Sequence, residues 1–284
     1  KFRVLQRDFA ELSSGKKVIE YEEVVVSSNT MTFEEYIDLR NLAFIIFVTN
    51  QGIVFDAIQK LLREQDIDVF ELYYTMLTNK ENSSENTQKV IEQFQQATTG
   101  ELWDSPQELL ENFQKDSEYK KLLNGEAGTN VLYHYKAVVI SEYMDDWTEY
   151  VIESAHAVIK NSNNYNDQLE KQFETVANYC RGLSHNVLGQ DRLDTNPEYE
   201  FEYNIPSWLS PKTNLKLDNF KLAAKLKISF QLDDEQFKMV QDNIDVYGHS
   251  RIGKSKTLKM LPNQKLWRHP LVTSNHTTYL CWDD

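Results

Sequence analysis

Several kinds of residue are scarce in this sequence, and each shortage excludes a class of protein. Among 284 residues there are two cysteines, Cys180 and Cys281, which lie far apart in unrelated contexts. Neither a disulfide scaffold nor a cysteine-bound metal cluster is therefore expected. Apolar runs are too short to cross a bilayer, and no signal peptide is recognisable. These absences together favour a cytoplasmic location.

Basic residues are outnumbered by acidic ones. Lysine and arginine total 30 against 44 aspartates and glutamates, which gives a net charge of -14. A surface of this sign repels nucleic-acid phosphates and anionic lipids, so neither nucleic acid nor membrane is expected as a partner. The 40% of hydrophobic residues is enough to build a sizeable core.

Motifs of familiar catalytic and metal sites are also missing. The six histidines include no pair at the i, i+4 spacing that places two ligands on one helix face, so no metal site is expected. There is no GxSxG nucleophile motif. The segment from Gly248 to Ser255 formally matches the phosphate-loop pattern GxxxxGKS. A helix is expected before it, where the mechanism needs a strand, so an exposed basic turn is favoured. No catalytic residue is predicted.

One stretch carries the clearest helix signals. Thr32 and Glu35 form the pattern of a capping box, and Gly52 supplies a stop for a helix between them. The second half of this helix is apolar nearly all round, so we expect it to be enclosed by other elements. A strand is predicted before it, at residues 18–26.

Further elements follow from hydrophobic periodicity and end signals. Helices are predicted over residues 54–64, 69–77, 106–125 and 169–183. The tract 129–160 is read either as one helix of about 48 Å or as two helices that meet in a bend at Asp145 and Asp146. Strands are predicted over residues 199–203 and 226–232, before a helix capped by Asp233 and Gln236 and ended by Gly248.

The predicted fold is mainly α. We expect a helical domain with one N-terminal strand over residues 1–190 and a small α+β C-terminal segment over residues 191–284.

Four polar residues are candidates for contact with a substrate or partner. Arg40 and Asn50 lie on the capped helix, although a salt bridge for Arg40 and a helix C-cap for Asn50 are the favoured alternatives. Arg181 and His185, four residues apart, form a possible anion site near a helix end. The favoured alternative for this pair is that it complements the helix dipole.

A family resemblance emerges from two patches of sequence. The first is EYEEVVVSSNTMTFEEYIDLRNLAFIIFVTNQGIVFDAIQKLLRE, and the second comprises YNIPSWLS, ISFQL, DDEQFKMVQDNIDVYG and LWRHP, which contains Arg268. In this order they resemble the region after the catalytic barrel in radical S-adenosylmethionine proteins with a cobalamin-binding domain. The matching positions in the first patch are Glu23, Ser27, Ser28, Thr30, Thr32, Glu34, Glu35, Tyr36, Arg40, Asn50 and Gly52.

The resemblance implies a parent enzyme that uses S-adenosylmethionine, a four-iron cluster and cobalamin. Members of the family hold the cluster with CxxxCxxC and the cobalamin with a histidine motif, and neither occurs here. Because the chain begins at Lys1 without methionine, we expect a fragment of a longer protein.

The function expected on this basis is that of a non-catalytic C-terminal accessory region. It would cover the barrel, shape the substrate site or dock a partner. Its own partners would be the barrel domain of the parent enzyme and an unidentified substrate. The alternative is a stand-alone helical protein-interaction module without enzymatic activity.

Overall fold

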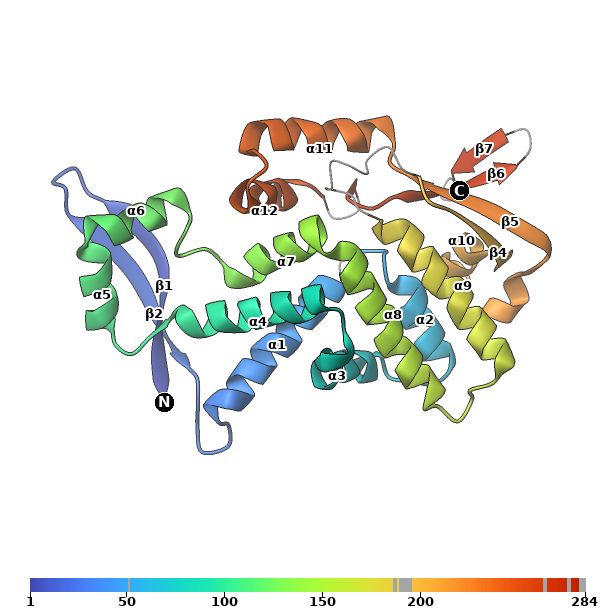
Figure 1. The fold of residues 1–284 in the computed structure, drawn as a ribbon, viewed down its shortest axis with the longest axis horizontal. Coiled ribbons are helices and arrows are strands. Elements are labelled where there is room, and N and C mark those ends of the chain that lie inside the picture. Colours follow the sequence, from blue (N-terminus) through green and yellow to red (C-terminus); the bar gives the residue numbers. More distant parts are fainter. Residues whose placement is uncertain (51, 186–187, 189–195, 263–264, 275–276, 281–284) are drawn as a thin grey trace.

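Helices dominate the computed structural model, which describes residues 1–50, 52–185, 188, 196–262, 265–274 and 277–280. A small antiparallel sheet lies at each end of the molecule, with the main group of helices between them (Figure 1). The predicted class, mainly α with a small α+β tail, is confirmed. Among the described residues, none of the helices combines the length and apolar character needed to span a membrane.

The N-terminal sheet contains the predicted strand and a partner for it. Strand β2 (Lys17–Val25) pairs antiparallel with β1 (Phe2–Glu11), and β3 (Leu102–Trp103) completes the order β2-β1-β3. The sequence predicted a single N-terminal strand, which is β2, and did not predict β1. Its hydrophobic alternation is interrupted by a register shift between Gln6 and Phe9, which weakens the period-2 signal.

Two short helices cover this sheet. The single helix predicted before Gly125 is broken into α5 (Pro106–Gln114) and α6 (Asp116–Asn124), because Lys115 adopts an extended conformation between them. The predicted ends hold, since Ser105 caps α5 and Gly125 ends α6 with φ 73°. Sheet and helices share a small hydrophobic cluster: Val4, Ile19, Leu109, Phe113, Tyr119 and Leu122.

The predicted capped helix is α1 (Phe33–Thr49). Thr32 and Glu35 form the complete capping box, and Asn50 is the C-cap, two residues before Gly52. Phe44, Ile45 and Val48 in its second half are at most 1% exposed, as expected for an enclosed segment.

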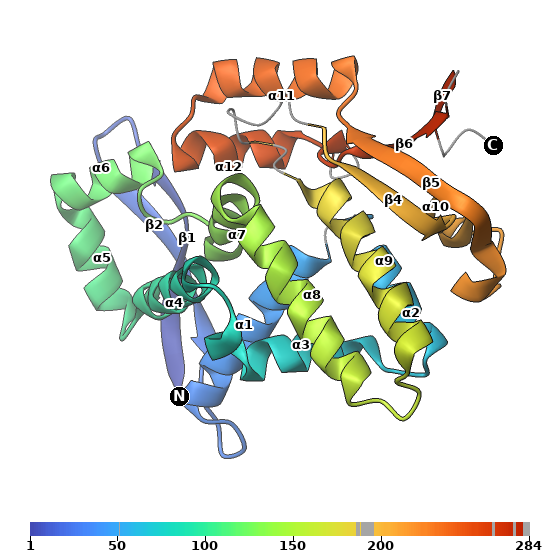
Figure 2. The same ribbon diagram turned by 45° about the vertical axis from the view of Figure 1, so that its right-hand side comes forward.

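The main hydrophobic cluster contains α1 and six further helices, and residues of the C-terminal sheet and its helices also belong to it. The six helices are α2 (Asp56–Glu64), α3 (Val69–Thr78), α4 (Glu85–Gly100), α7 (Val131–Glu142), α8 (Met144–Lys160) and α9 (Asp167–Ser184), with a 3-10 turn (η1) at Lys80–Asn82. The long tract is therefore two helices, and its break falls at Tyr143, just before the two aspartates. Helices α8 and α9 lie side by side, with α2 behind them (Figure 2).

The tail forms a second sheet with its own helices. Strands β4 (Glu198–Tyr203), β5 (Lys221–Gln231), β6 (His269–Ser274) and β7 (Thr277–Leu280) pair antiparallel in that order. They are accompanied by α10 (Ile205–Leu209), a 3-10 turn (η3, Leu217–Phe220), α11 (Asp234–Tyr247) and α12 (Arg251–Met260). The Asp233–Gln236 capping box and the stop at Gly248 are confirmed. The predicted division near residue 190 lies outside the described residues.

The phosphate-loop match falls between two helices. Helix α11 precedes it, so the strand that such a loop requires is replaced by a helix, as expected. The segment is not an exposed turn, because Ser250 caps α12 and Gly253 lies within that helix. A Cβ at Gly253 would come within 2.3 Å of the Tyr247 and Gly248 carbonyl oxygens. The glycine thus permits close packing of α12 on the end of α11.

Helix α9 approaches β5 so closely at Gly182 that one added methyl group should destabilise the protein. A Cβ at Gly182 would lie 2.4 Å from the Phe230 ring, whereas nothing lies within 4 Å of a Cβ at Gly100 in α4. We expect Gly182→Ala to lower the free energy of unfolding by about 1–3 kcal/mol through overpacking. Gly100→Ala, the matched control, should leave it unchanged or raise it by up to about 1 kcal/mol. Urea denaturation of both variants provides the measurement, and equal effects would contradict this packing.

Burial of Lys136 in α7 predicts a pH-dependent stability. Its side chain is 6% exposed and its Nζ lies 5.0 Å from the centre of the Phe47 ring. Burial lowers the pKa of Lys136 from 10.5 to about 8. Between these values the unfolded chain binds more protons than the folded one, so this lysine makes stability rise with pH, by on the order of 3 kcal/mol in total.

Replacement of Lys136 by methionine tests this effect, because methionine retains the apolar stem and cannot titrate. The stability advantage of Lys136→Met over the wild type should be largest below pH 8 and shrink towards pH 10.5. Urea denaturation at pH 7 and pH 10 measures both proteins. A difference that stays constant between the two pH values would show that the lysine is not desolvated.

Candidate functional site

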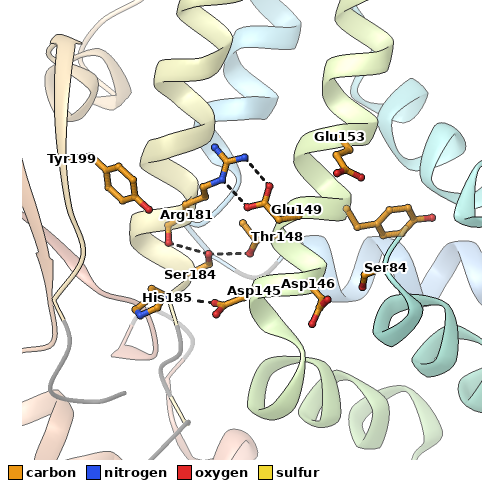
Figure 3. A pocket seen from close by; sticks show the side chains of 11 residues that line it. Ser84, Asp145, Asp146, Thr148, Glu149, Glu153, Arg181, Ser184, His185 and Tyr199 are labelled. Carbon is orange, nitrogen blue, oxygen red and sulfur yellow. Dashed lines mark hydrogen bonds and ion pairs between the residues drawn. The ribbon is translucent and has the colours of Figure 1, made fainter. Parts of the chain in front are cut away.

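A cavity of about 450 Å³ opens between α8 and α9, beside β4 and the start of α4 (Figure 3). It brings together two of the predicted contact residues, Arg181 and His185. The side chains that line it are those of Ser84, Asp145, Asp146, Thr148, Glu149, Tyr150, Glu153, Arg181, Ser184, His185 and Tyr199.

Helical spacing explains why α8 presents carboxylates to this cavity. Asp145, Glu149 and Glu153 follow each other at intervals of four residues, which places them along one side of the helix. Trp147 and Val151, which lie between them in sequence, are fully buried in the main core. The amphipathic pattern of α8 therefore positions an acidic stripe at the edge of the core, and Figure 3 shows two of its members, Asp145 and Glu149, directed toward α9.

Arg181 is held by two hydrogen bonds to one carboxylate. Its Nε and Nη2 donate to the two oxygens of Glu149 at 2.6 and 2.7 Å, and its Nη1 donates to the Asn178 Oδ1 at 2.9 Å. The bond to Glu149 raises the pKa of Arg181. Because these donors are already engaged, an anion would have to compete with Glu149. Arg181 thus has a structural partner in Glu149, and its place in the last turn of α9 also agrees with the alternative weighed for it, that it complements the helix dipole.

The end of α9 is tied to α8 through hydroxyl groups. Thr148 Oγ1 donates to Ser184 Oγ at 2.9 Å, and Ser184 Oγ contacts the Arg181 carbonyl oxygen at 3.4 Å. His185 is the C-cap of α9, and its Nδ1 lies 3.8 Å from Asp145 Oδ1. This distance suits an ion pair once the imidazole is protonated and is too long for a hydrogen bond. Ser184 is thus held as a structural hydroxyl rather than presented as a nucleophile.

The charge of the cavity suits a cationic group. Four carboxylates, those of Asp145, Asp146, Glu149 and Glu153, face one guanidinium and one imidazole. Such an excess favours an amine or guanidinium over an anion. Across the described part of the chain, no group of three or more histidine, cysteine, aspartate or glutamate side chains is placed to hold a metal ion.

The other two predicted contact residues lie elsewhere and have structural partners. Arg40 Nη2 is 3.4 Å from Glu101 Oε1, which is the salt bridge weighed as its alternative. Asn50 is the C-cap of α1, and its Oδ1 accepts a hydrogen bond from Gln59 Nε2 at 2.9 Å. Neither lines the cavity beside Arg181.

Sequence reasoning missed the acidic side chains that accompany Arg181. Glu149 lies 32 residues from its partner. The sequence alone shows that acidic residues repeat every four positions along one side of α8. It does not show which helix packs against that side. The adjacent pair Asp145 and Asp146 was interpreted only as a bend.

The ion pair between Arg181 and Glu149 should give a measurable coupling. Their side chains are 32% and 46% exposed, so solvent screening limits the pair to about 0.5–1 kcal/mol despite its two hydrogen bonds. A double-mutant cycle with Arg181→Ala and Glu149→Ala, followed by urea denaturation, isolates this energy. The more exposed pair Lys238 and Asp242 in α11, at 76% and 59%, is the control and should couple more weakly. Equal coupling in the two cycles would contradict the geometry at α9.

Comparison with protein-family models, with curated proteins and with solved structures found no match to this chain.

Proposed function

We propose that this chain is a non-catalytic accessory region of a cobalamin-dependent radical S-adenosylmethionine enzyme, and that it docks on the barrel domain of that enzyme through its N-terminal hairpin. The observation that carries the proposal is the position of the residues behind the family resemblance. Four of the eleven matching positions in the first patch, Ser27, Ser28, Thr30 and Thr32, lie in the turn between β2 and α1, beside residue 1 (Figure 1).

The turn is shaped by its own hydrogen bonds. The backbone nitrogen of Lys1 donates to the Ser27 carbonyl oxygen at 2.5 Å. The Ser28 hydroxyl accepts from the Thr30 backbone amide at 3.2 Å, and Thr32 begins the capping box of α1. The side chains of Ser28, Thr30 and Thr32 are exposed. The small hydroxyl residues of the resemblance thus give a surface turn its shape and do not fill the core.

Strand β2 adds an open edge and apolar side chains. It pairs with β1 on one side only, because it is the outer strand of its sheet. Phe2 and Val25, which face each other across the two strands, are 59% and 49% exposed, and Tyr21 is 42% exposed. An unpaired strand edge with exposed apolar groups is a typical surface for binding another protein. We call Phe2, Tyr21 and Val25 the hairpin surface.

The one cysteine in the described part of the chain does not suit the cluster of the proposed parent. Cys180 is fully buried in α9, and burial raises the pKa of its thiol to about 12, so it does not fit a cluster ligand. Cys281 lies outside the described residues. In this proposal the four-iron cluster, S-adenosylmethionine and cobalamin are held by the rest of the parent in the cytoplasm. This chain contributes the docking surface.

The reading frame upstream of the Lys1 codon provides a direct test. We expect it to encode three cysteines in the spacing CxxxCxxC, because the barrel of the proposed parent needs them for its cluster. Sequencing of the gene checks this. A start codon immediately before Lys1 would overturn the proposal and favour the stand-alone interaction module.

Docking is tested by placing charge on the hairpin surface. We expect Val25→Glu to weaken binding of this chain to the separately produced upstream region at least tenfold, because a carboxylate would be buried against the partner. Isothermal titration calorimetry measures the affinity. Val246→Glu, at a 73% exposed position on α11, is the matched control and should bind like the wild type. Undiminished binding by Val25→Glu would exclude the hairpin as the docking surface.

A further inference from the structure

The open edge of β2 presents backbone groups of three residues. In the described part of the chain β2 pairs with β1 alone, and residues 21–25 lie opposite residues 6–2 without a shift in register. Just beyond that stretch, the Val26 amide donates to the Lys1 carbonyl oxygen. Hydrogen-bonded and non-hydrogen-bonded pairs alternate along an antiparallel ladder. The N–H and C=O groups of Tyr21, Glu23 and Val25 therefore point away from β1, toward the open edge.

The side chains beside this edge combine apolar groups with negative charge. Tyr21, Glu23 and Val25 lie on one face of the strand, because they are two residues apart, and all three are exposed. Glu20 is exposed on the other face. Neither Glu20 nor Glu23 makes an ion pair with any group that the structure describes. An occupant of the edge would therefore meet two carboxylates as well as two apolar side chains.

The carboxylates argue against a second copy of this chain as the occupant. Two copies of β2 that pair antiparallel about a two-fold axis meet at one central residue of the edge. A centre at residue 20, 22 or 23 places a glutamate opposite itself, and a centre at Tyr21 places Glu20 opposite Glu22. Like charges directly opposite each other destabilise a pair of strands. The edge is thus protected against self-association and favours a strand of opposite charge.

A basic extended segment suits the same edge. Lysine or arginine opposite Glu20 and Glu23 forms cross-strand pairs of opposite charge, and apolar residues opposite Tyr21 and Val25 cover the exposed side chains. The backbone of the segment would bond to the outward N–H and C=O groups, as in other cases of strand addition. The neighbouring strands all pair antiparallel, which is also the more stable arrangement.

We propose that the open edge of β2 binds a basic extended segment, which adds to the sheet as an antiparallel strand beyond β2. This binding mode rests on the proposed function, because it gives the chemistry of the segment by which the barrel domain would be held. The segment carries lysine or arginine at two positions three residues apart, which fit Glu20 and Glu23, and apolar residues at the positions opposite Tyr21 and Val25.

The probe is the hexapeptide VTKTVK with acetylated and amidated ends, whose third and sixth residues would lie opposite Glu23 and Glu20. VTETVE is its matched control, with the same pattern and the opposite charge. We expect VTKTVK to give saturable chemical-shift changes at the amides of Tyr21, Glu23 and Val25 in two-dimensional NMR spectra of the wild-type chain. VTETVE should bind at least tenfold more weakly. No saturable binding of VTKTVK, or equal binding of VTETVE, would overturn the proposal.

Methylation of the peptide backbone distinguishes strand pairing from attraction of charge alone. The third and fifth amides of VTKTVK would donate to Glu23 and Tyr21, so N-methylation of both should weaken binding at least tenfold. The second and fourth amides would point away from β2, and their N-methylation is the control that should leave the affinity within about threefold. Equal losses in the two methylated peptides would exclude strand addition.

A change of one charge on the protein locates the peptide. We expect Glu23→Gln to weaken binding of VTKTVK at least threefold, because it removes the carboxylate opposite a lysine. Glu174→Gln, at an exposed position in α9, changes the net charge equally and should bind the peptide like the wild type. Both side chains are exposed, so the Tm of each variant should equal that of the wild type. Equal affinity in the two variants would contradict the assignment to β2.

Competition separates this binding mode from the proposed function. The separately produced upstream region should displace VTKTVK from the wild-type chain, because both would occupy one edge. Simultaneous binding of the two would show that the upstream region docks elsewhere and would overturn strand addition by that region. If VTKTVK binds and the upstream region does not, the edge is supported as a site for basic strands, and the docking of this chain on a barrel domain is contradicted.

Discussion

The buried guanidinium of Arg268 links the end of α9 to the C-terminal sheet. Arg268 is fully buried and donates from Nε to the His185 carbonyl oxygen at 2.8 Å, and from Nη1 to Asn196 Oδ1 at 2.9 Å and the Phe230 carbonyl oxygen at 3.2 Å. Burial lowers the pKa of Arg268, yet an arginine remains protonated in proteins. Its charge must therefore be met by acceptors, and these come from the end of α9, from β5 and from the start of the tail. The position of His185 in the acidic cavity depends on this arrangement.

A second buried polar group strengthens the same junction. Gln236, the capping-box residue of α11, is fully buried and also donates to the carbonyl oxygens of Lys265 and Trp267 at 3.1 and 2.9 Å. The Gln236 side chain thus caps the start of α11 and also binds residues 265–267, the segment just before Arg268. Buried polar groups of this kind specify a unique arrangement because each alternative packing would leave donors or acceptors unpaired. The tail is fixed to the helical core by such groups as well as by its apolar contacts.

The hairpin surface and the acidic cavity differ in place and chemistry. The hairpin surface lies at the opposite end of the molecule from the C-terminal sheet (Figure 1). The acidic cavity between α8 and α9 suits a cation, whereas the hairpin surface exposes the apolar side chains of Phe2, Tyr21 and Val25. The acidic cavity has no residue of β1 or β2 in its lining, so the two can be altered separately by substitution.

The sequence by itself determined the features that depend on neighbouring residues. Both capping boxes, at Thr32 and at Asp233, were predicted because cap and partner are three residues apart. The mainly helical class followed from hydrophobic periodicity in the same way. Tertiary structure decided the rest, because the interactions that decide it join distant segments. Arg181 meets Glu149 32 residues away, and Gly128 lies against Gln6, 122 residues earlier in the chain. The local sequence pattern determines on which side of its own helix or strand each residue lies. The residue that it contacts on another element depends on how the whole core packs.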